Sequence, residues 1–164
     1  MKIVDLIDKK TINVDLKAVS KDEVLLEMVE MLILSGKIKK QDKNEIFNKL
    51  REREELGSTG IGKGVAIPHA KSSNLKNMIA AFGISKKGVD FKSLDGAPSY
   101  IFFLLIAPSN LTGPHLKALA KISRLLDDKF IRDRLLLAKN GETVQNIIKE
   151  ESEKADKMQG KAIS

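Results

Sequence analysis

Apolar residues occur at helical spacing in the N-terminal third of the chain. Between Val24 and Leu32 they recur every three or four positions. Ser20 and Glu23 form a capping box just before them, in which the Ser20 hydroxyl accepts from the Glu23 amide and the Glu23 side chain returns a bond. Gly36 then offers a left-handed stop. The pattern predicts a helix here.

A second helix is predicted over residues 42–56, where Ile46, Phe47 and Leu50 form the apolar stripe. The segment that follows, residues 57–64, reads GSTGIGKG. Its glycine content disfavours both helix and strand, so we expect a loop.

After this loop, the spacing of apolar residues changes from the helical pattern to the pattern of β-strands. Residues 65–67 predict a short buried strand, closed by Pro68 because proline cannot donate to a ladder. Residues 79–85 and 100–107 are the clearest strands, and the second is apolar on both faces, which predicts a central position in the sheet. Turn residues separate these two strands, at positions 86–88 and 95–98.

The last third returns to helical spacing. Pro114 suits the first turn of a helix with an apolar stripe at Leu116, Leu119, Ile122 and Leu126. Two further helices are predicted, one beginning at Asp127 or Asp128 and ending before Asn140–Gly141, and one beginning at Thr143.

Helices, then strands, then helices, with no linker or internal repeat, predict one α/β domain over residues 1–150. We expect a mixed β-sheet with helices on both faces. Residues 151–164 lose apolar periodicity, which predicts a polar C-terminal tail that is frayed helix or disordered.

Composition restricts the possible functions. The 164 residues include no cysteine, which excludes disulfides and thiolate metal sites, and only two histidines, which limits zinc chemistry. The net charge is +7, but lysines alternate with acids and only 4% of residues are aromatic, so we expect a surface that favours acidic partners or phosphate rather than nucleic acid. No apolar run approaches the roughly 20 residues of a membrane span, and the N-terminus lacks a signal pattern, so we expect a cytoplasmic protein without membrane insertion.

The glycine-rich segment matches most of the nucleotide-binding pattern G-x-x-x-x-G-K-[ST]. Gly64 stands where that pattern needs a magnesium-binding hydroxyl. The order of elements also differs, because a helix precedes this loop and a strand follows it, whereas a phosphate loop opens a helix. We therefore expect no nucleotide, cofactor or metal, although the glycines still let backbone amides approach an anion.

His69 follows Pro68 at the end of the short predicted strand, beside the flexible loop. Neutral imidazole is a competent nucleophile near neutral pH, so His69 is the candidate nucleophile. A surface or capping histidine without function is the alternative.

Arg51–Glu52, the segment Gly57–Ser–Thr–Gly–Ile–Gly62 and Val65–Ala–Ile–Pro–His69 together resemble the signature of enzyme IIA domains of the bacterial phosphoenolpyruvate-dependent sugar phosphotransferase system. The domains with this signature form the fructose–mannitol class of enzyme IIA. Within that class, the residues of the glycine-rich segment most resemble those of the fructose and nitrogen-regulatory branches. The similarity continues through Pro114–His115–Leu116 and covers roughly residues 4–150. One departure is Ala70, where the family usually has glycine.

The resemblance implies a phosphocarrier. His69 would accept a phosphoryl group from a phosphorylated histidine phosphocarrier protein and pass it to a cysteine of an enzyme IIB partner during fructose-type sugar uptake. In the nitrogen-regulatory branch, the phosphorylation state would instead control regulatory target proteins. The family also implies that the reacting ring atom is Nε2.

The resemblance makes Arg51 and His115 catalytic candidates. Arg51 can present a bidentate guanidinium to phosphoryl oxygens, and its alternative is a surface ion pair. His115 lies in the first turn of a helix, where amides and the helix dipole favour an anion, and its alternative is a histidine without function. Ser58 and Thr59 are candidates for binding the phosphoryl group, or for stabilising the turn.

Two other classes of function compete with the phosphocarrier. One is a binding module that kept the fold and lost transfer, which the combined presence of His69, Arg51 and His115 disfavours. The other is a histidine-dependent phosphatase or nuclease. Metal-assisted hydrolysis needs carboxylates near the histidine, and none clusters with His69 or His115 in the sequence.

Overall fold

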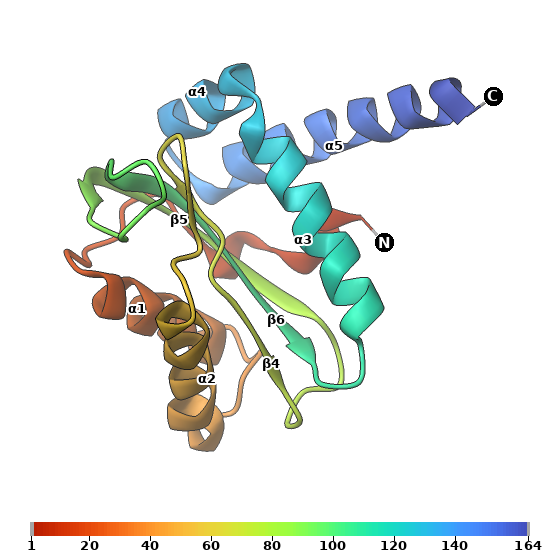
Figure 1. Ribbon diagram of the computed structural model, residues 1–164. Coiled ribbons are helices and arrows are strands. Elements are labelled where there is room, and N and C mark those ends of the chain that lie inside the picture. The colour runs from red at the N-terminus through yellow and green to blue at the C-terminus, as the bar shows by residue number, and fades with distance from the viewer. Residues whose placement is uncertain (1, 164) are drawn as a thin grey trace.

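A mixed six-stranded sheet forms the centre of the molecule (Figure 1), which is described over residues 2–163 in this computed structural model. Along the sheet the strands run in the order β1-β5-β6-β3-β2, and β4 also pairs with β6. The strands are β1 (Ile12–Asn13), β2 (Gly60–Gly62), β3 (Val65–Ala66), β4 (His69–Ser72), β5 (Ile79–Val89) and β6 (Ser99–Pro108). β6 is therefore central, as its two apolar faces predict: β5 pairs with it antiparallel, and β3 and β4 pair with it parallel.

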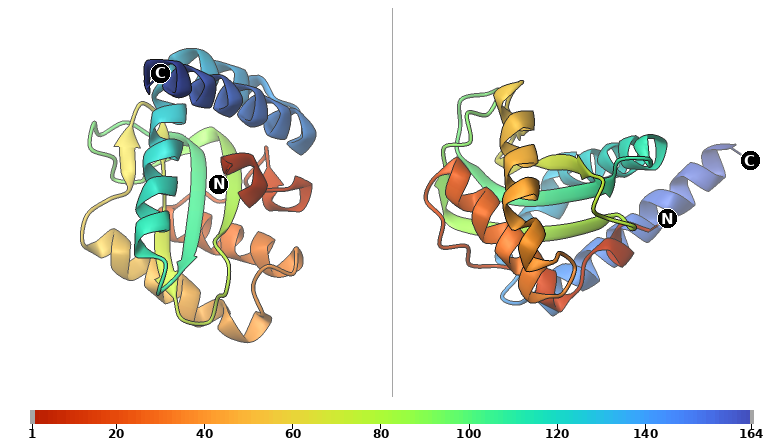
Figure 2. Two further views of the ribbon diagram at one scale, coloured as in Figure 1. Left: turned by 90° about the vertical axis from the view of Figure 1, so that its right-hand side faces the viewer. Right: turned by 90° about the horizontal axis from the view of Figure 1, so that it is seen from below.

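Five α-helices cover the sheet on both faces, as predicted. They are α1 (Lys21–Leu34), α2 (Lys43–Glu55), α3 (Thr112–Asp127), α4 (Lys129–Leu137) and α5 (Gly141–Ile163). In the views of Figures 1 and 2, α1 and α2 lie on one side of the sheet, and α3 and α5 lie on the other. Three short 3₁₀ helices complete the helical elements, at Ile3–Leu6, Lys9–Thr11 and Lys40–Asp42.

Alternation along β6 divides the core into two layers. Phe102 and Leu104 pack with the apolar residues of α1 and α2. Phe103 and Leu105 pack on the opposite face with residues of α3, α4 and α5. All four side chains are fully buried. Because successive strand residues point to opposite faces, a strand apolar at every position is required between two helical layers.

The local signals around the first helix are confirmed with one difference. Ser20 Oγ accepts from the Glu23 amide at 3.3 Å, and Gly36 has a φ of 79°. The Glu23 carboxylate accepts from the amide of Val19, one residue before the cap, at 2.9 Å.

The glycine-rich segment is not wholly a loop, which corrects the prediction. Gly60–Gly62 forms β2, antiparallel to β3. A Cβ at position 60 would collide with Ser93 Oγ and lie 3.0 Å from Ser93 Cα. Gly60 therefore serves a close approach of two backbones, a requirement that local composition does not reveal.

Two further boundaries differ from the prediction. The expected turn at residues 86–88 belongs to β5, whose pairing with β6 is irregular between Ile84 and Val89. Gly88 absorbs the irregularity with a φ of 83°, and its amide donates to Ser85 Oγ at 3.1 Å. In addition, His69 does not end the strand of residues 65–67, because it begins β4.

The C-terminal helices are confirmed in number, and their details differ. Asp128 caps α4 by accepting from the amides of Phe130 and Ile131. In α3, Leu116 is 62% exposed and does not belong to the buried stripe, which contains Ala118 and Leu125 in addition to the expected Ile122 and Leu126. α5 continues to Ile163, so the segment expected to be frayed or disordered is helical as far as the described residues extend. Among residues 2–163, no helix has the length and apolar character needed to cross a bilayer.

Candidate functional site

His69 begins β4, opposite Leu105 in the register with β6. Its side chain is half-buried, and Nδ1 lies 2.9 Å from the carbonyl oxygen of Ile67. A carbonyl only accepts, so Nδ1 carries the ring proton and donates, and Nε2 keeps its lone pair. Burial lowers the pKa of His69 below 6.5, which further favours the neutral ring. The local backbone therefore presents Nε2 of His69 as a nucleophile.

His115 lies in the first turn of α3 and faces His69. The two rings meet edge to face, with centroids 5.6 Å apart and planes at 72°. His115 is 3% exposed, and its Nε2 has no hydrogen-bond partner among residues 2–163. Its pKa falls to about 4, because the ring is buried and because His69 and Lys71 are close by. His115 is therefore neutral at physiological pH, with one buried polar atom unsatisfied.

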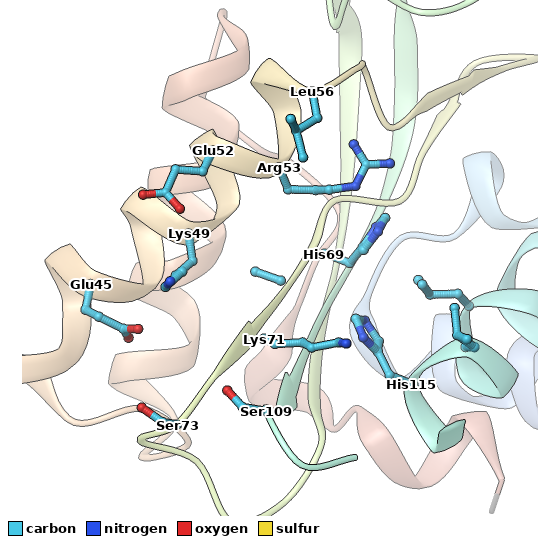
Figure 3. A pocket seen from close by; sticks show the side chains of 13 residues that line it. Glu45, Lys49, Glu52, Arg53, Leu56, His69, Lys71, Ser73, Ser109 and His115 are labelled. Carbon is cyan, nitrogen blue, oxygen red and sulfur yellow. The ribbon is translucent and has the colours of Figure 1, made fainter. Parts of the chain in front are cut away.

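The two histidines line a cleft of about 490 Å³ between α2 and α3 (Figure 3). β4 supplies His69 and Lys71, the α2 wall includes Lys49 and Arg53, and α3 supplies His115. The cleft thus joins three elements from separate parts of the chain.

Arg53, and not Arg51, reaches this cleft. The Arg51 guanidinium lies over the ring of Phe47, at 5.7 Å, and Arg51 Nε lies 3.5 Å from a carboxylate oxygen of Asp22. Arg53 lines the cleft, donates from Nη1 to the carbonyl oxygen of Gly57 at 2.8 Å, and its charge helps to lower the pKa of His69. Two successive steps of about 100° separate these residues around the helix, so they point in different directions. In this structure the Arg51 side chain therefore does not line the cleft that contains His69.

Sequence reasoning missed Arg53, although a signal for it exists. Lys49, Glu52, Arg53 and Leu56 follow one another at spacings of three, one and three positions along one helix face, and all four line the cleft. Helical spacing places these four residues on one flank of the buried stripe of Ile46 and Leu50, and the packing of α2 turns this flank towards β4.

Ser58 and Thr59 are not among the residues that line the cleft, and both are engaged elsewhere. Ser58 Oγ donates to the carbonyl oxygen of Phe91 at 2.6 Å and accepts from the Gly60 amide at 3.0 Å. Thr59 is 4% exposed, and both its amide and its hydroxyl donate to the buried carboxylate of Glu54. In this structure both residues stabilise the turn.

Lys71 is a cleft residue without a signal in the sequence. Its ammonium donates to Thr112 Oγ1 at 2.9 Å, at the first residue of α3. Within the described residues, no three or more His, Cys, Asp or Glu side chains are grouped so as to hold a metal ion. The cleft is lined by two imidazoles, a guanidinium, the ammonium groups of Lys49 and Lys71 and the carboxylates of Glu45 and Glu52. Its cationic groups suit an anion.

Comparison with known protein families identifies the family of this chain. The model of the family "Phosphoenolpyruvate-dependent sugar phosphotransferase system, EIIA 2" matches residues 5–151. The chain belongs to this family. EIIA proteins are phosphotransfer components of that system, and the match covers both cleft histidines.

Relatives of this EIIA chain include fructose-specific phosphotransferase components and nitrogen regulatory proteins. The fructose-specific EIIABC component of Bacillus subtilis is 40% identical over 148 residues, which is 90% of this chain and 23% of that protein. The chain thus spans about a quarter of that relative. The nitrogen regulatory protein of Bradyrhizobium diazoefficiens is 36% identical over 148 residues, which is 90% of this chain and 95% of that protein.

Solved structures confirm the EIIA fold. The nitrogen regulatory protein IIA-Ntr of Neisseria meningitidis superposes with a TM-score of 0.82 at 33% identity, over 89% of this chain and 98% of that one. The mannitol IIA of Escherichia coli, solved in complex with phosphorylated IIB, superposes with a TM-score of 0.73 at 20% identity, over 88% of this chain and 97% of that one. The second likeness shows the fold alone.

Proposed function

We propose that this EIIA chain carries a phosphoryl group on His69 in the cytoplasm. It accepts the group from a phosphorylated histidine phosphocarrier protein and passes it to a cysteine of an enzyme IIB partner during fructose-type sugar uptake. The observation that carries this proposal is the pair of neutral imidazoles in an open cleft, one with a free Nε2 lone pair and the other with a buried, unpartnered Nε2.

Transfer consists of two in-line displacements at phosphorus. The lone pair of His69 Nε2 attacks the phosphorus, the new N–P bond forms, and the N–P bond of the donor breaks, with its electron pair returning to the donor imidazole. In the second step a thiolate of the IIB cysteine attacks the same phosphorus, and the bond to His69 Nε2 breaks. The bond from Nδ1 to the Ile67 carbonyl holds the ring direction and tautomer throughout.

Positive charge and hydrogen-bond donors around His69 support these steps. Arg53 brings a guanidinium to the cleft, where it can bind two phosphoryl oxygens at once. The unsatisfied Nε2 of His115 can donate to a phosphoryl oxygen when its ring is in the Nε2–H tautomer. Such donors act mainly by stabilising the charge that develops during transfer.

The rim of the cleft suits a protein partner. Leu56, 85% exposed at the end of α2, and Leu116, 62% exposed on α3, line the cleft from opposite sides of His69. Exposed apolar side chains around a polar centre are typical of protein–protein contacts. The mannitol IIA that shares this fold assembles with phosphorylated IIB.

A second candidate is a nitrogen-regulatory EIIA, whose phosphorylation state controls partner proteins. Its support is the match to nitrogen regulatory proteins along nearly their whole length, at 36% and 33% identity. Both candidates use the same chemistry at His69, and they differ in whether a IIB cysteine receives the group.

Incubation with the phosphorylated phosphocarrier tests the shared step. We expect one phosphoryl group per chain, in an acid-labile and base-stable bond, with no metal or nucleotide added beyond the phosphodonor. His69→Ala should abolish the labelling and keep the fold, because the side chain is only half-buried. Undiminished labelling of this variant refutes the assignment. Chase with a fructose-type IIB then separates the candidates, since loss of label to a IIB cysteine supports sugar uptake.

A further inference from the structure

We propose that Lys71 is a further catalytic residue of this cleft, whose ammonium binds an oxygen of the phosphoryl group during transfer at His69. The inference rests on the proposed function and deepens it. Lys71 is the next residue but one after the reactive histidine in β4, and both line the same cleft.

The strand geometry puts the two side chains on one face. In β4, Ala70 packs into the core layer of α1 and α2, and Ser72 is buried beside it. His69 and Lys71 alternate with them and remain half-buried. Residues two apart in a strand are separated by roughly 6.6 Å along its axis, so a flexible lysine can reach a group held on its neighbour's ring.

Lys71 is held where a negative charge is favourable. Its ammonium donates to Thr112 Oγ1, the hydroxyl of the first residue of α3. Figure 3 shows the end of this side chain beside the ring of His115. The positive charge of Lys71 also contributes to the low pKa of His115. An ammonium has three donors, and the bond to Thr112 uses one of them.

No carboxylate of the part of the chain that the structure describes forms an ion pair with Lys71. Among the described residues, the ion pairs include neither Lys71 nor Arg53. The acids of the cleft, Glu45 and Glu52, lie on the α2 wall, where Glu45 accepts from Ser72. Lys71 lies by His115, while Arg53 extends from the other wall (Figure 3). A phosphorylated side chain carries roughly 1.5 to 2 negative charges, which the single positive charge of Arg53 does not balance.

The bond to Thr112 can be exchanged for a stronger one. A hydroxyl is a neutral acceptor, whereas a phosphoryl oxygen is charged and forms a shorter, stronger bond with an ammonium. We therefore expect Lys71 to leave Thr112, or to keep it and add a second bond, when the phosphoryl group arrives. In the unphosphorylated protein, the bond to Thr112 holds the Lys71 ammonium in position.

Single-turnover transfer from the phosphorylated phosphocarrier tests this inference with Lys71→Met, Lys71→Arg and the control Lys117→Met. Lys117 is exposed on α3, two residues after His115, and is not among the residues that line the cleft, so its substitution makes the same charge change nearby. At saturating donor we expect Lys71→Met to slow transfer about tenfold to a hundredfold, Lys71→Arg to restore most of the rate, and Lys117→Met to match the wild type.

Each other outcome overturns the inference. An unchanged rate for Lys71→Met at saturation shows that the ammonium does not act on the transferred group. Weaker docking with an unchanged saturating rate makes Lys71 a docking residue only. Equal slowing by Lys117→Met reduces the effect to general positive potential. If the wild type labels on His69 and Lys71→Met is as fast, only the role of Lys71 fails; if the wild type does not label on His69, the proposed function fails and this inference with it.

Discussion

Arg53 and Gly57 are joined by a hydrogen bond, with Nη1 of the guanidinium donating to the carbonyl oxygen over 2.8 Å. Among the described residues, Arg53 is the only arginine of α2 that lines the cleft. The bond connects it to the first residue of the glycine-rich segment. Arg51 meanwhile lies by Asp22 on α1. The two arginines near the end of α2 thus have separate environments, and the proposed chemistry needs only Arg53.

Arg53→Ala should slow single-turnover phosphoryl transfer about a hundredfold to a thousandfold, because it removes a donor aimed at developing charge. Arg51→Ala, the matched control, should change the rate less than about threefold, since an exposed ion pair has little energetic value. Rapid-quench measurement of both variants decides between the two arginines. A slow Arg51→Ala beside a normal Arg53→Ala would return the role to Arg51.

His115 should make the stability of the fold depend on pH. Its folded-state pKa is about 4, against 6.5 as the ordinary value, so the unfolded chain binds more protons between these pH values. The stabilisation is complete above 6.5 and decreases as the pH falls towards 4, by at most about 1.4 kcal/mol per pH unit. The lowered pKa of His69 acts in the same direction.

Urea unfolding of the wild type and of His115→Gln measures this contribution. Between about pH 7 and about pH 4.5 the wild type should lose roughly 1 to 3 kcal/mol more stability than the variant, because glutamine does not titrate. Carboxylates titrate in both proteins and cancel in the comparison. Parallel pH dependence in the two proteins would contradict a buried neutral His115.

Glu54 should be essential for stability. The residue is 9% exposed, and its carboxylate accepts from Lys21 Nζ at 3.1 Å and from the amide and hydroxyl of Thr59. Glu54→Ala leaves these donors unpaired and should cost about 2 to 4 kcal/mol of unfolding free energy. Glu55→Ala, at an exposed neighbouring position, should stay within about 0.5 kcal/mol. Urea titration measures both, and equal effects would show that the Glu54 contacts contribute nothing specific.

Two glycine substitutions should have opposite effects on thermal stability. Gly60→Ala should lower the melting temperature, at a cost of about 1 to 3 kcal/mol, because its Cβ meets the side chain and backbone of Ser93. Gly160→Ala, in α5, places its added Cβ more than 4 Å from every atom outside its chain neighbours and the nearby backbone of its own helix. It should stabilise the helix by up to about 1 kcal/mol, since alanine loses less conformational entropy. Scanning calorimetry compares the two, and a tolerated Gly60→Ala would argue against close contact of β2 with Ser93.

The sequence by itself determined the helices, the two long strands and the choice of His69 as the candidate nucleophile. Helical and strand periods come from which residues must face a core, and a pattern such as Val24–Leu32 or residues 100–107 contains that information locally. His69 stands in a contiguous signature that lies within the family match of residues 5–151.

Only the tertiary structure decided which other residues meet His69. The choice of Arg53 over Arg51 depends on how α2 is rotated against β4, and the position of Lys71 depends on where α3 begins. Gly60–Gly62 forms a strand because Ser93 leaves space only for glycine, and Ser58 and Thr59 turn away because Phe91 and Glu54 accept their hydrogen bonds. Except for the bond between Thr59 and Glu54, these contacts join residues far apart in the chain. Local periodicity does not encode the relative placement of packed elements.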